Sequence, residues 1–437
     1  MSAVRMTQLE VPDYTLGLRG KMLRPEKIEA GSTAFCTIIY GLDPVDGVAE
    51  TPLSSAANGY PDAFAVVDES TRVPLAWRPG TDAVIADLHD ETGTILGESP
   101  RGVVQRLIAE FGELGLAPVL GFEYECYVMY ADDATLRAHD YRSLRPLGRV
   151  DNAYSLSRVA DASSLLSEFV DRMESVGIPV EAVHSELGPG FFEYALAPMD
   201  ALRATDSAVR ARQYFRDLCA ERGLLATFMA KFRGGASGSG GHVHQSLSRN
   251  GVNVMSDGAG GLSDVGRHYL AGLLSTMGDF TALFNPLLNS YKRISAGFFV
   301  SENASWGWDN RNAACRVVAN AGSGATRIEH RRPGADANPY LLAAGMLAGG
   351  LVGVRGALDP GAPLEVGADA TATGAVLPRD LRVATQALDT SVVARQLLGD
   401  PFVDCFVATR NAELAAFDHW WDTTITDWEL RRYLETL

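Results

Sequence analysis

The sequence contains no uninterrupted hydrophobic run that is long enough to span a bilayer. Its most apolar stretch, residues 341–354, is about two-thirds of the ~20 residues that a transmembrane helix needs. The first eight residues, Met-Ser-Ala-Val-Arg-Met-Thr-Gln, lack the apolar segment of a signal peptide. We therefore expect a cytoplasmic protein with no membrane-spanning or targeting segment.

Clusters of basic residues are also missing. The chain has 54 acidic and 38 basic residues, a formal net charge of −16, and no run of lysine or arginine. Such a surface repels nucleic acid and anionic lipid. We expect neither as a partner.

The cysteines show neither disulfide nor metal-binding spacing. They are Cys36, Cys126, Cys219, Cys315 and Cys405. An odd, unpatterned set favours reduced thiols and excludes a disulfide scaffold. No internal repeat and no low-complexity linker is present. A chain of 437 residues with 46% apolar content can instead build two ordinary cores.

Turn and cap signals divide the chain into a small and a large region. Short β-like runs at 34–40, 63–67 and 83–88 alternate with glycine, proline and aspartate turns, which predicts a small sheet. Ser99 and Pro100 are typical of the N-cap and first residue of a helix, here extending to about residue 113. We expect an N-terminal domain at 1–108 and a larger domain at 109–437.

Strands and helices are interleaved in the larger region. Expected strands are 119–129, 180–187 and 191–196, and expected helices run from Asp161 to Gly177, from Asp200 to Arg222, over 262–284 and from Asn338 onward. The short link Gly188-Pro-Gly between two of these strands marks an antiparallel hairpin. The pattern favours an α+β fold over a doubly wound parallel sheet.

A glycine-rich loop at residues 234–241 is the clearest functional signal. Its five glycines allow positive φ and a close approach of the backbone to a ligand. Alternation along the strand that follows puts His242, His244 and Ser246 on one face. A lone strand histidine or a glycine loop alone is a weak signal, but convergent polar groups beside such a loop predict a ligand site.

Glutamates recur on the expected strands. Glu123 and Glu125 share one face of an apolar strand, and Glu186 and Glu193 lie on the two arms of the hairpin. Simple register leaves the second pair one residue out of step, so a bulge at the hairpin glycines would be needed to bring them together. Solvent-facing strand charges are the alternative, since like charges inside a domain are costly without compensating cations.

Arg327, Glu329 and Arg331 alternate onto one face of a later strand. This pattern is either a surface ion-pair ladder of little energetic value or a metal ligand between two anion-binding guanidiniums. Five glutamates with the imidazole of His242 suit Mg²⁺ or Mn²⁺. Together with a glycine loop and arginines, they have the composition of a phosphoryl-transfer site. The further arginines available are Arg293, Arg311 and Arg316.

Six ordered motifs resemble those of the glutamine synthetase family, over nearly the whole chain from about residue 30. They begin at Gly121, His184, Ala226, Gly238, Asn285 and Arg327, and Asn338-Pro-Tyr-Leu follows the last. The resemblance implies a β-grasp-like N-terminal domain and a catalytic domain of curved antiparallel sheet and helices. It also implies hexameric rings, assembled as a dodecamer, in which the small domain completes a neighbour's site.

The resemblance implies a role for individual residues. Two or three Mg²⁺ or Mn²⁺ ions would bind in two ligand sets, Glu125, Glu186 and Glu193 in one and Glu123, His242 and Glu329 in the other. The two substrates would contact Arg293, Gly238, Ser237, Tyr154 and Phe299. The nucleotide would contact Glu181, His244, Ser246, Arg316 and Arg327. The catalytic residues would be Arg311 and Arg331, which bind the transferring phosphoryl group, and Glu186.

The activity implied is that of an ATP-dependent ligase acting on small molecules. ATP phosphorylates the γ-carboxylate of glutamate, and an amine then displaces phosphate from the acyl phosphate. The stretches Ser305-Trp-Gly-Trp-Asp-Asn-Arg and Gly59-Tyr-Pro-Asp-Ala-Phe-Ala are similar to those of γ-glutamyl-polyamine and γ-glutamyl-amide ligases. This similarity favours an organic amine as the second substrate.

Departures from the family pattern leave three alternatives open. Phe299 stands where ammonia-using relatives present a glutamate, so we expect an apolar amine subsite with deprotonation by Glu186, Glu302 or water. Phe191 and Ser237 replace residues common beside the acid substrate. The alternatives are glutamine synthesis from ammonia, a ligase for another carboxylic acid, and a catalytically silent scaffold. Retention of all six metal ligands argues against the scaffold, because clustered carboxylates repel one another.

Overall fold

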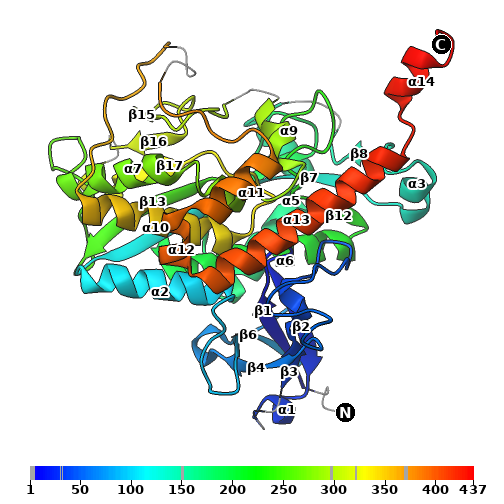
Figure 1. Ribbon diagram of the computed structural model, residues 1–437, viewed down its shortest axis with the longest axis horizontal. Coiled ribbons are helices and arrows are strands. Elements are labelled where there is room, and N and C mark those ends of the chain that lie inside the picture. Colours follow the sequence, from blue (N-terminus) through cyan, green and yellow to red (C-terminus); the bar gives the residue numbers. More distant parts are fainter. Residues whose placement is uncertain are drawn as a thin grey trace.

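A computed structural model of the chain describes residues 5–437 except 30, 32, 149–151, 296–298, 320–321 and 369–372. It contains one small and one large sheet, and most of the helices pack around the large sheet (Figure 1). The small sheet, coloured blue, forms the lower part of the molecule in Figure 1. The expected α+β class is confirmed. No helix among the described residues has the length and apolarity to cross a membrane.

The small sheet has six strands in the order β2-β1-β6-β4-β3, with β5 paired to β6. The strands are β1 (Met6–Pro12), β2 (Leu18–Leu23), β3 (Ala34–Cys36), β4 (Asp62–Val67), β5 (Val73–Pro74) and β6 (Thr81–His89). Short helices α1 (Pro25–Glu29), η1 (Thr37–Tyr40) and η2 (Glu69–Thr71) connect them. The predicted strand at 34–40 was wrong in its second half, because residues 37–40 form a 3₁₀ turn that buries Ile39 and Tyr40.

The large sheet has eleven strands, seven of them along the path β15-β16-β17-β13-β7-β10-β9; off this path, β8, β11 and β12 pair with β7, and β14 pairs with β13. Its strands are β7 (Ala117–Tyr130), β8 (Arg145–Pro146), β9 (Val180–Ser185), β10 (Phe191–Leu196), β11 (Met199–Asp200), β12 (Leu224–Thr227), β13 (Val243–Arg249), β14 (Val252–Asn253), β15 (Trp306–Trp308), β16 (Cys315–Val318) and β17 (Arg327–His330). β7 is the long central strand, paired with β10 and β13 along its length. Its neighbours therefore present their side chains beside those of β7.

The helices of the large domain mostly begin where cap signals predict. They are α2 (Pro100–Glu113), α3 (Asp133–Ala138), α4 (Leu156–Asp161), α5 (Ser163–Ser175), α6 (Ala201–Glu221), α7 (Asp264–Thr276), α8 (Thr281–Phe284), α9 (Ser290–Ser295), α10 (Pro339–Gly356), α11 (Leu381–Thr390), α12 (Val392–Leu398), α13 (Asp400–Thr423) and α14 (Asp427–Tyr433), with the 3₁₀ turn η3 (Ser323–Ala325). Ser99 Oγ accepts from Gly102 N at 3.0 Å, and Asn338 Oδ1 accepts from Tyr340 N at 2.9 Å. Both predicted N-caps are confirmed.

Two helix predictions were wrong in their bounds. Asp161 is the last residue of α4, and α5 begins two residues later, so Asp161 does not cap the longer helix. The helix predicted over 262–284 is two helices, α7 and α8, with Gly278 and Asp279 between them. Glycine and aspartate are poor helix formers, and Asp279 accepts a hydrogen bond from Ser391 at 2.6 Å. The break thus ties this region to the N-terminus of α12.

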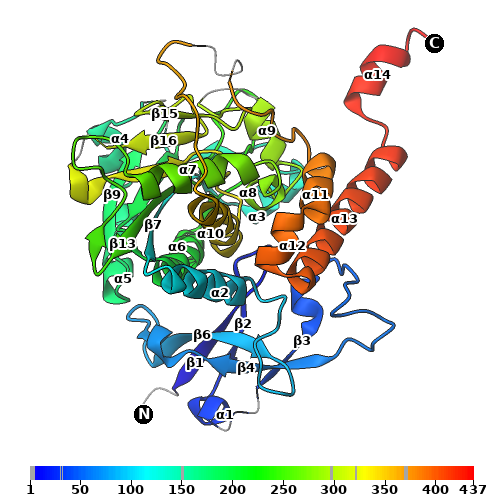
Figure 2. The ribbon, with the colours of Figure 1, turned by 60° about the vertical axis from the view of Figure 1, so that its left-hand side comes forward.

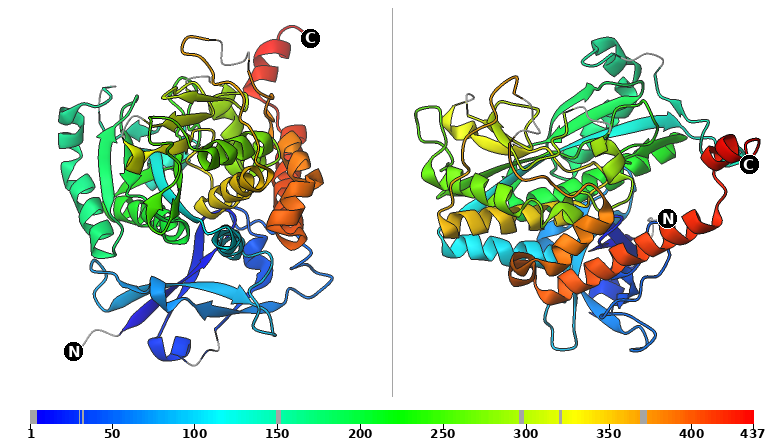
Figure 3. Two further views of the ribbon diagram at one scale, coloured as in Figure 1. Left: turned by 90° about the vertical axis from the view of Figure 1, so that its left-hand side faces the viewer. Right: turned by 45° about the horizontal axis from the view of Figure 1, so that its top comes forward.

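Helix α10 lies at the centre of the large domain, between α7, α2 and α6 (Figure 2). A Cβ atom added at Gly272 of α7 would lie 2.1 Å from the carbonyl oxygen of Gly349, so glycine is needed for the two helices to pack so closely. Helix α2 lies between the small sheet and the large domain (Figure 3, left). The expected domain boundary at 108/109 falls within α2 and stays a prediction.

Candidate active site

One face of the large sheet carries a row of charged side chains across three strands. The register places His184 of β9 opposite Glu193 of β10, and Glu193 opposite Glu125 of β7. Two residues back along β7, Glu123 donates its backbone N–H to the carbonyl of His242 at 3.0 Å. Since residues two apart on a strand share a face, these side chains converge.

A second row continues the pattern on the neighbouring strands. His244 of β13 is opposite Glu329 of β17, and Glu329 is opposite Arg316 of β16. His244 Nε2 lies 2.8 Å from Glu123 Oε1, which joins the two rows. The expected alternation of His242 and His244 onto one face is therefore present. It places two imidazoles among carboxylates that come from three strands.

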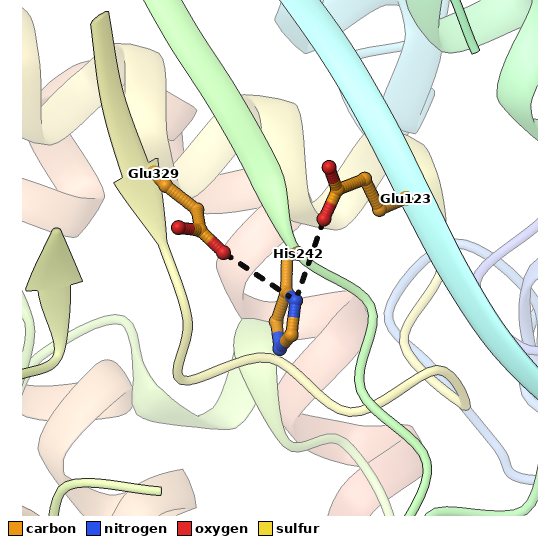
Figure 4. Close-up of side chains that lie close together, drawn as sticks. All are labelled: Glu123, His242 and Glu329. Carbon is orange, nitrogen blue, oxygen red and sulfur yellow. Dashed lines mark ion pairs between the residues drawn. The ribbon is translucent and has the colours of Figure 1, made fainter. Parts of the chain in front are cut away.

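Glu123, His242 and Glu329 form one cluster of possible metal ligands, shown in Figure 4. Nδ1 of His242 lies 3.6 Å from Glu123 Oε2 and 3.6 Å from Glu329 Oε1. One ligand atom from each residue lies within 4.8 Å of the others. This is the arrangement expected for one of the two predicted ligand sets.

The other predicted set is spread over two overlapping clusters. Glu125, Glu193 and His242 form one, and His184, Glu186 and Glu193 form the other. His184 Nε2 lies 3.0 Å from Glu186 Oε1 and 3.5 Å from Glu193 Oε1. His184 was not predicted as a site residue, although its spacing of two from Glu186 on an expected strand was a usable signal.

The hairpin itself corrects one expectation. Glu186 donates its backbone N–H to the carbonyl of Phe191 at 2.8 Å, so Glu193 sits opposite His184 and diagonal to Glu186 on the same face. The predicted bulge at the hairpin glycines was therefore wrong. The only register shift in this strand pair, among the described residues, lies between Ala195 and Leu196.

The electrostatics of the cluster show an excess of negative charge. Burial, and after it the neighbouring carboxylates of Glu123 and Glu125, together raise the pKa of Glu193 to about 9. Burial also disfavours ionised Glu329, but Arg331 and His242 outweigh it and lower its pKa to about 2. A cluster in which one carboxylate retains its proton while its neighbour is ionised would accept an added cation readily.

Three predicted arginines surround this cluster. Arg331 Nη1 donates to Glu329 Oε1, and Arg316 Nη1 donates to Glu329 Oε2 at 3.0 Å. Arg327 Nε donates to His244 Nδ1 at 3.0 Å. The pattern on β17 is thus a buried arrangement around Glu329, not an exposed ion-pair ladder.

The glycine-rich loop packs against Arg293 of α9. A Cβ atom at Gly238 would lie 2.6 Å from Arg293 Cγ, and one at Gly240 would lie 2.9 Å from Arg293 Nη2. Burial lowers the pKa of Arg293, partly offset by Glu125. Ser237 Oγ donates to the carbonyl of Leu187 at 2.6 Å, which ties the loop to the hairpin. Glycines are therefore needed where the loop passes the guanidinium.

Phe191 is the first residue of β10 and lies opposite Tyr127 of β7. Its buried ring stacks on Tyr127 with centroids 4.1 Å apart and an interplanar angle of 5°. Together with Met129 the two rings form a small core separate from the main one. The interpretation that Phe191 bears on the acid substrate thereby loses its support.

The two aromatic residues expected at the amine, Tyr154 and Phe299, are both exposed. The ring of Tyr154 stacks on His184, with centroids 5.0 Å apart, and is 72% exposed. Burial, Glu186 and Glu193 raise the pKa of Tyr154, and Arg311 lowers it, so Arg311 lies within electrostatic reach. Phe299 is 43% exposed, and residues 296–298 before it lie outside the described residues.

A cavity of about 650 Å³ adjoins the cluster. Of the residues predicted to bind nucleotide, Glu181, His244, Ser246 and Arg327 line it, and Glu123 borders both cavity and cluster. Arg316 does not line the cavity; it pairs with Asp309 and Glu329. The volume suits a ligand of nucleotide size.

Known proteins resemble this chain over nearly its full length. A family model described as the catalytic domain of glutamine synthetase matches residues 97–433. Glutamate–isopropylamine ligase of a Pseudomonas species is 33% identical over 429 residues, covering 96% of this chain and 92% of that protein. γ-Glutamylethanolamide synthetase of Streptomyces coelicolor is 34% identical over 439 residues, covering 98% and 92%.

A solved structure gives the same result for the fold. GmaS, determined without ligand and as an ADP complex, superposes with a TM-score of 0.83 at 25% identity, covering 99% of this chain and 97% of that one. With the family model, the relatives and the fold in agreement, the chain belongs to the glutamine synthetase family of carbon–nitrogen ligases, which implies that it uses ATP and a divalent metal.

Proposed function

We propose that the protein joins the γ-carboxylate of glutamate to an organic amine through a γ-glutamyl phosphate, with cleavage of ATP. The observation that carries this proposal is the position of Glu123, which borders both the carboxylate cluster and the nucleotide-sized cavity. A nucleotide in the cavity would bring its terminal phosphate to the cluster. The relatives named for isopropylamine and ethanolamide support an organic amine as acceptor.

The donor atoms fit Mg²⁺ or Mn²⁺. Carboxylate oxygens with one imidazole match the preference of these ions, and no described cysteine belongs to the clusters. Two or three ions would be held by Glu123, Glu125, Glu186, Glu193, His242 and Glu329. When bound, the ions neutralise phosphate charge and polarise the phosphoryl oxygens.

The arginines would bind the anionic groups of the substrates. Arg293, held under the loop at Gly238, would bind the carboxylate of the acid substrate, with Ser237 at the loop's edge. Arg331 and Arg311 would bind the transferring phosphoryl group from two sides. Because phosphoryl transfer depends on positioning and charge neutralisation, fixed guanidiniums supply much of what is needed.

The nucleotide would occupy the 650 Å³ cavity, against His244, Ser246 and Arg327 with Glu181 at its edge. Arg316 would act on the phosphates from the Glu329 side, consistent with its ion pair to that carboxylate. The hydrogen bond from Arg327 to His244 orients both side chains toward the cavity that they line.

The amine would enter beside Tyr154 and Phe299, where aromatic side chains offer an apolar wall. Glu186 would accept its proton, since its carboxylate lies next to His184 on the same side as Tyr154. Glutamine synthesis from ammonia is the alternative. The acidic pair Glu186 and Glu193 favours it, because a small cation is attracted to such a pocket.

The experiment is ATP- and Mg²⁺-dependent phosphate release with L-glutamate and a panel of acceptors, with products identified by mass. The panel holds ammonia, small alkylamines, ethanolamine, polyamines and aromatic amines. Amide formed with an organic amine, and little with ammonia, supports the proposal. Efficient use of ammonia alone establishes the alternative. No product with any acceptor rejects glutamate, and the acid is then varied.

We also propose self-association into hexameric rings and a dodecamer. Support comes from an exposed C-terminal segment, residues 417–437, which we call the apolar arm. It projects from the body of the molecule (Figure 1). Its exposed apolar side chains are Phe417, Trp420, Trp421, Ile425, Trp428, Leu430, Tyr433, Leu434 and Leu437. Contiguous exposed apolar surface marks interaction sites.

A cytoplasmic location stays a prediction.

A further inference from the structure

Arg332, two residues beyond the end of β17, is a buried cation that forms no ion pair within the described part of the chain. Its side chain is fully buried, its Nε has no hydrogen-bond partner, and no carboxylate of the described residues forms an ion pair with it. Burial lowers its pKa to about 10. Burying an uncompensated charge is costly, and an apolar residue of similar volume would fold with less penalty. Burial of the charge by itself therefore does not account for an arginine here.

The guanidinium of Arg332 joins two segments that are far apart in the sequence. Its Nη1 donates to the carbonyl of Ser301 at 2.6 Å, and its Nη2 donates to the carbonyl of Pro378 at 3.1 Å. A planar guanidinium can hold two separate carbonyls at fixed angles, which a lysine ammonium does less well. The first carbonyl belongs to residues 299–305, which we call the acceptor segment because Phe299 begins it.

The acceptor segment is also bound along its length to residues 373–378. Hydrogen bonds run from Leu377 N to Glu302 O (3.0 Å), from Ala304 N to Ala375 O (2.9 Å) and from Asn303 Nδ2 to Thr373 O (3.1 Å). Gly374 has φ +80°, and a Cβ atom there would lie 2.0 Å from the carbonyl oxygen of Ala304. Arg332 therefore lies under a two-segment unit that depends on a glycine for its fit.

The main chain of Arg332 faces the acid-binding side. Its carbonyl accepts from Arg293 Nη1 at 3.2 Å and from Asn285 Nδ2 at 3.4 Å. Its neighbour Arg331 donates to Glu329 of the carboxylate cluster. One residue thus links the arginine assigned to the acid substrate, the arginine assigned to the phosphoryl group and the segment assigned to the amine.

We propose that Arg332 is a positioning residue that fixes the acceptor segment relative to Arg293 and so favours amine over water as the nucleophile. This inference rests on the proposed function. In the productive step the amine nitrogen bonds to the acyl carbon, the bond from that carbon to the phosphate oxygen breaks, phosphate leaves with the electron pair, and the amine proton passes to a base. When water attacks instead, glutamate and phosphate form without amide.

The test compares Arg332→Met and Arg332→Lys with Arg355→Met, a matched control at an exposed arginine of α10 that pairs with Glu110. We measure phosphate released per amide formed, and KM for amine and for glutamate. Arg332→Met should raise the phosphate-to-amide ratio and the amine KM roughly tenfold each, because small displacements of reacting groups cost this much or more. The glutamate KM should stay within about twofold of the parent value. The lysine variant should recover part of the loss.

A folded Arg332→Met variant with parental coupling and amine KM would overturn the inference. Equal increases of both KM values would do the same, since they indicate a general loss of structure. Gly374→Ala loosens the same unit without removing a buried charge, and should reproduce the coupling defect if Arg332→Met fails to fold.

Hydrogen exchange separates this inference from the proposed function. Amides of residues 299–305 and 373–378 should exchange faster in Arg332→Met and in Gly374→Ala than in the parent or in Arg355→Met. If the parent makes no γ-glutamyl amide, the proposed function fails, yet the exchange result still decides whether Arg332 holds the acceptor segment. Unchanged exchange in both variants rejects that role.

Discussion

Glu193 is the residue at which the crowding of carboxylates is most visible. Its raised pKa, about 9, arises first from burial and then from the carboxylates around it, Glu123 and Glu125 first among them. At neutral pH the folded, metal-free chain holds a proton there that the unfolded chain releases. Stability from this group is present below its ordinary pKa and is lost as pH rises through about 9. A divalent cation can replace that proton.

A divalent cation and a proton should therefore compete for the carboxylate of Glu193. Mg²⁺ or Mn²⁺ should raise the melting temperature more at pH 8.5 than at pH 6.5, because proton and metal compete for the same carboxylates. Thermal unfolding with and without metal across about pH 6 to 9 measures the effect. In Glu193→Gln the metal-induced rise should be small and nearly independent of pH. A pH-independent rise in the parent would show that protons and metal do not compete.

Glu125 is the residue at which metal binding separates most cleanly from folding. Its Oε2 accepts a hydrogen bond from Gly240 N at 2.6 Å, and its carboxylate lies opposite Glu193. Glu125→Ala should lower kcat by about 100-fold or more through loss of a metal ligand. The metal-free melting temperature should fall little, because the substitution also relieves repulsion. Glu110→Ala, at an exposed ion pair on α2, is the control. Near-parental activity would remove Glu125 from the metal site.

Phe299 offers a test of the acceptor preference. Phe299→Glu places a carboxylate beside the proposed amine subsite, which attracts ammonium and disfavours an apolar substituent. The ratio of kcat/KM for ammonia to that for the best organic amine should rise at least roughly tenfold, since the introduced charge changes both terms. Phe299→Leu keeps the subsite apolar and should leave the ratio near that of the parent. The same ratio in both variants would place the amine elsewhere.

The site residues could be predicted where a local pattern and a long motif agree. His242, His244 and Glu329 follow strand alternation, which fixes the face on which they lie. Phe191 could not be assigned from the sequence, because an aromatic residue after a hairpin glycine is compatible with both a binding site and the core. Only the position of Tyr127 on another strand decides between them. His184 was missed because its spacing from Glu186 predicts only a shared face, whereas its position opposite Glu193 depends on the pairing of β9 with β10.

Helix α2 joins the small sheet to helix α6 of the large domain, through Arg101 in its first turn. Its Nη1 lies 2.6 Å from Asp87 Oδ2 of β6, and its Nη2 lies 2.7 Å from Asp68 Oδ2 and 3.0 Å from Asp206 Oδ2 of α6. Burial opposes the charge on Arg101, but Asp206 and Asp87 outweigh it and hold its pKa above the usual range. The charges compensate one another only while all are present.

Arg101→Met should therefore be strongly destabilising, by about 3–5 kcal/mol, because it leaves buried carboxylates unpaired. The midpoint of urea unfolding measures the loss, against Arg355→Met, for which an exposed ion pair predicts about 1 kcal/mol or less. An effect for Arg101→Met no larger than for the control would mean that water or protonation satisfies the aspartates without the arginine.

Helices could be predicted from the sequence where a capping residue or a glycine marks their ends. Ser99, Asn338 and the glycine at 223 mark helix ends that the structure has. Strands β1 and β2 were not predicted, because β1 is fixed by parallel pairing with β6, more than 70 residues later. The break between α7 and α8 was missed for a similar reason, since it is stabilised by Ser391, the N-cap residue of α12.

In a single subunit of the whole molecule, the apolar side chains of the apolar arm remain exposed to solvent. Helix α14 has seven residues, none of them buried, and an isolated helix of that length is marginal in water. Its capping box, between Thr426 and Glu429, fixes where it begins but adds little stability. Trp428 and Leu434 are 59% and 74% exposed. A second copy of the chain would supply the missing contacts, as the proposed ring assembly requires.

Removing residues 417–437 should therefore reduce the assembly without unfolding the subunit. The last buried apolar side chain of α13 is Leu414, so the truncation leaves the core intact. Light scattering of the full-length and truncated chains should give a smaller mass for the second, with a melting temperature changed chiefly through lost subunit contacts. The double variant Trp428→Arg, Leu434→Arg should also reduce the assembly, because both substitutions place charge where apolar contact is expected. Glu435→Arg is the control. It changes an exposed charge on the same segment and should leave the assembly intact. If the truncated chain forms an assembly with the same number of subunits, the arm has no role in assembly. The exposed apolar residues of the small sheet, Phe64 and Val66, are then the next candidates for the interface.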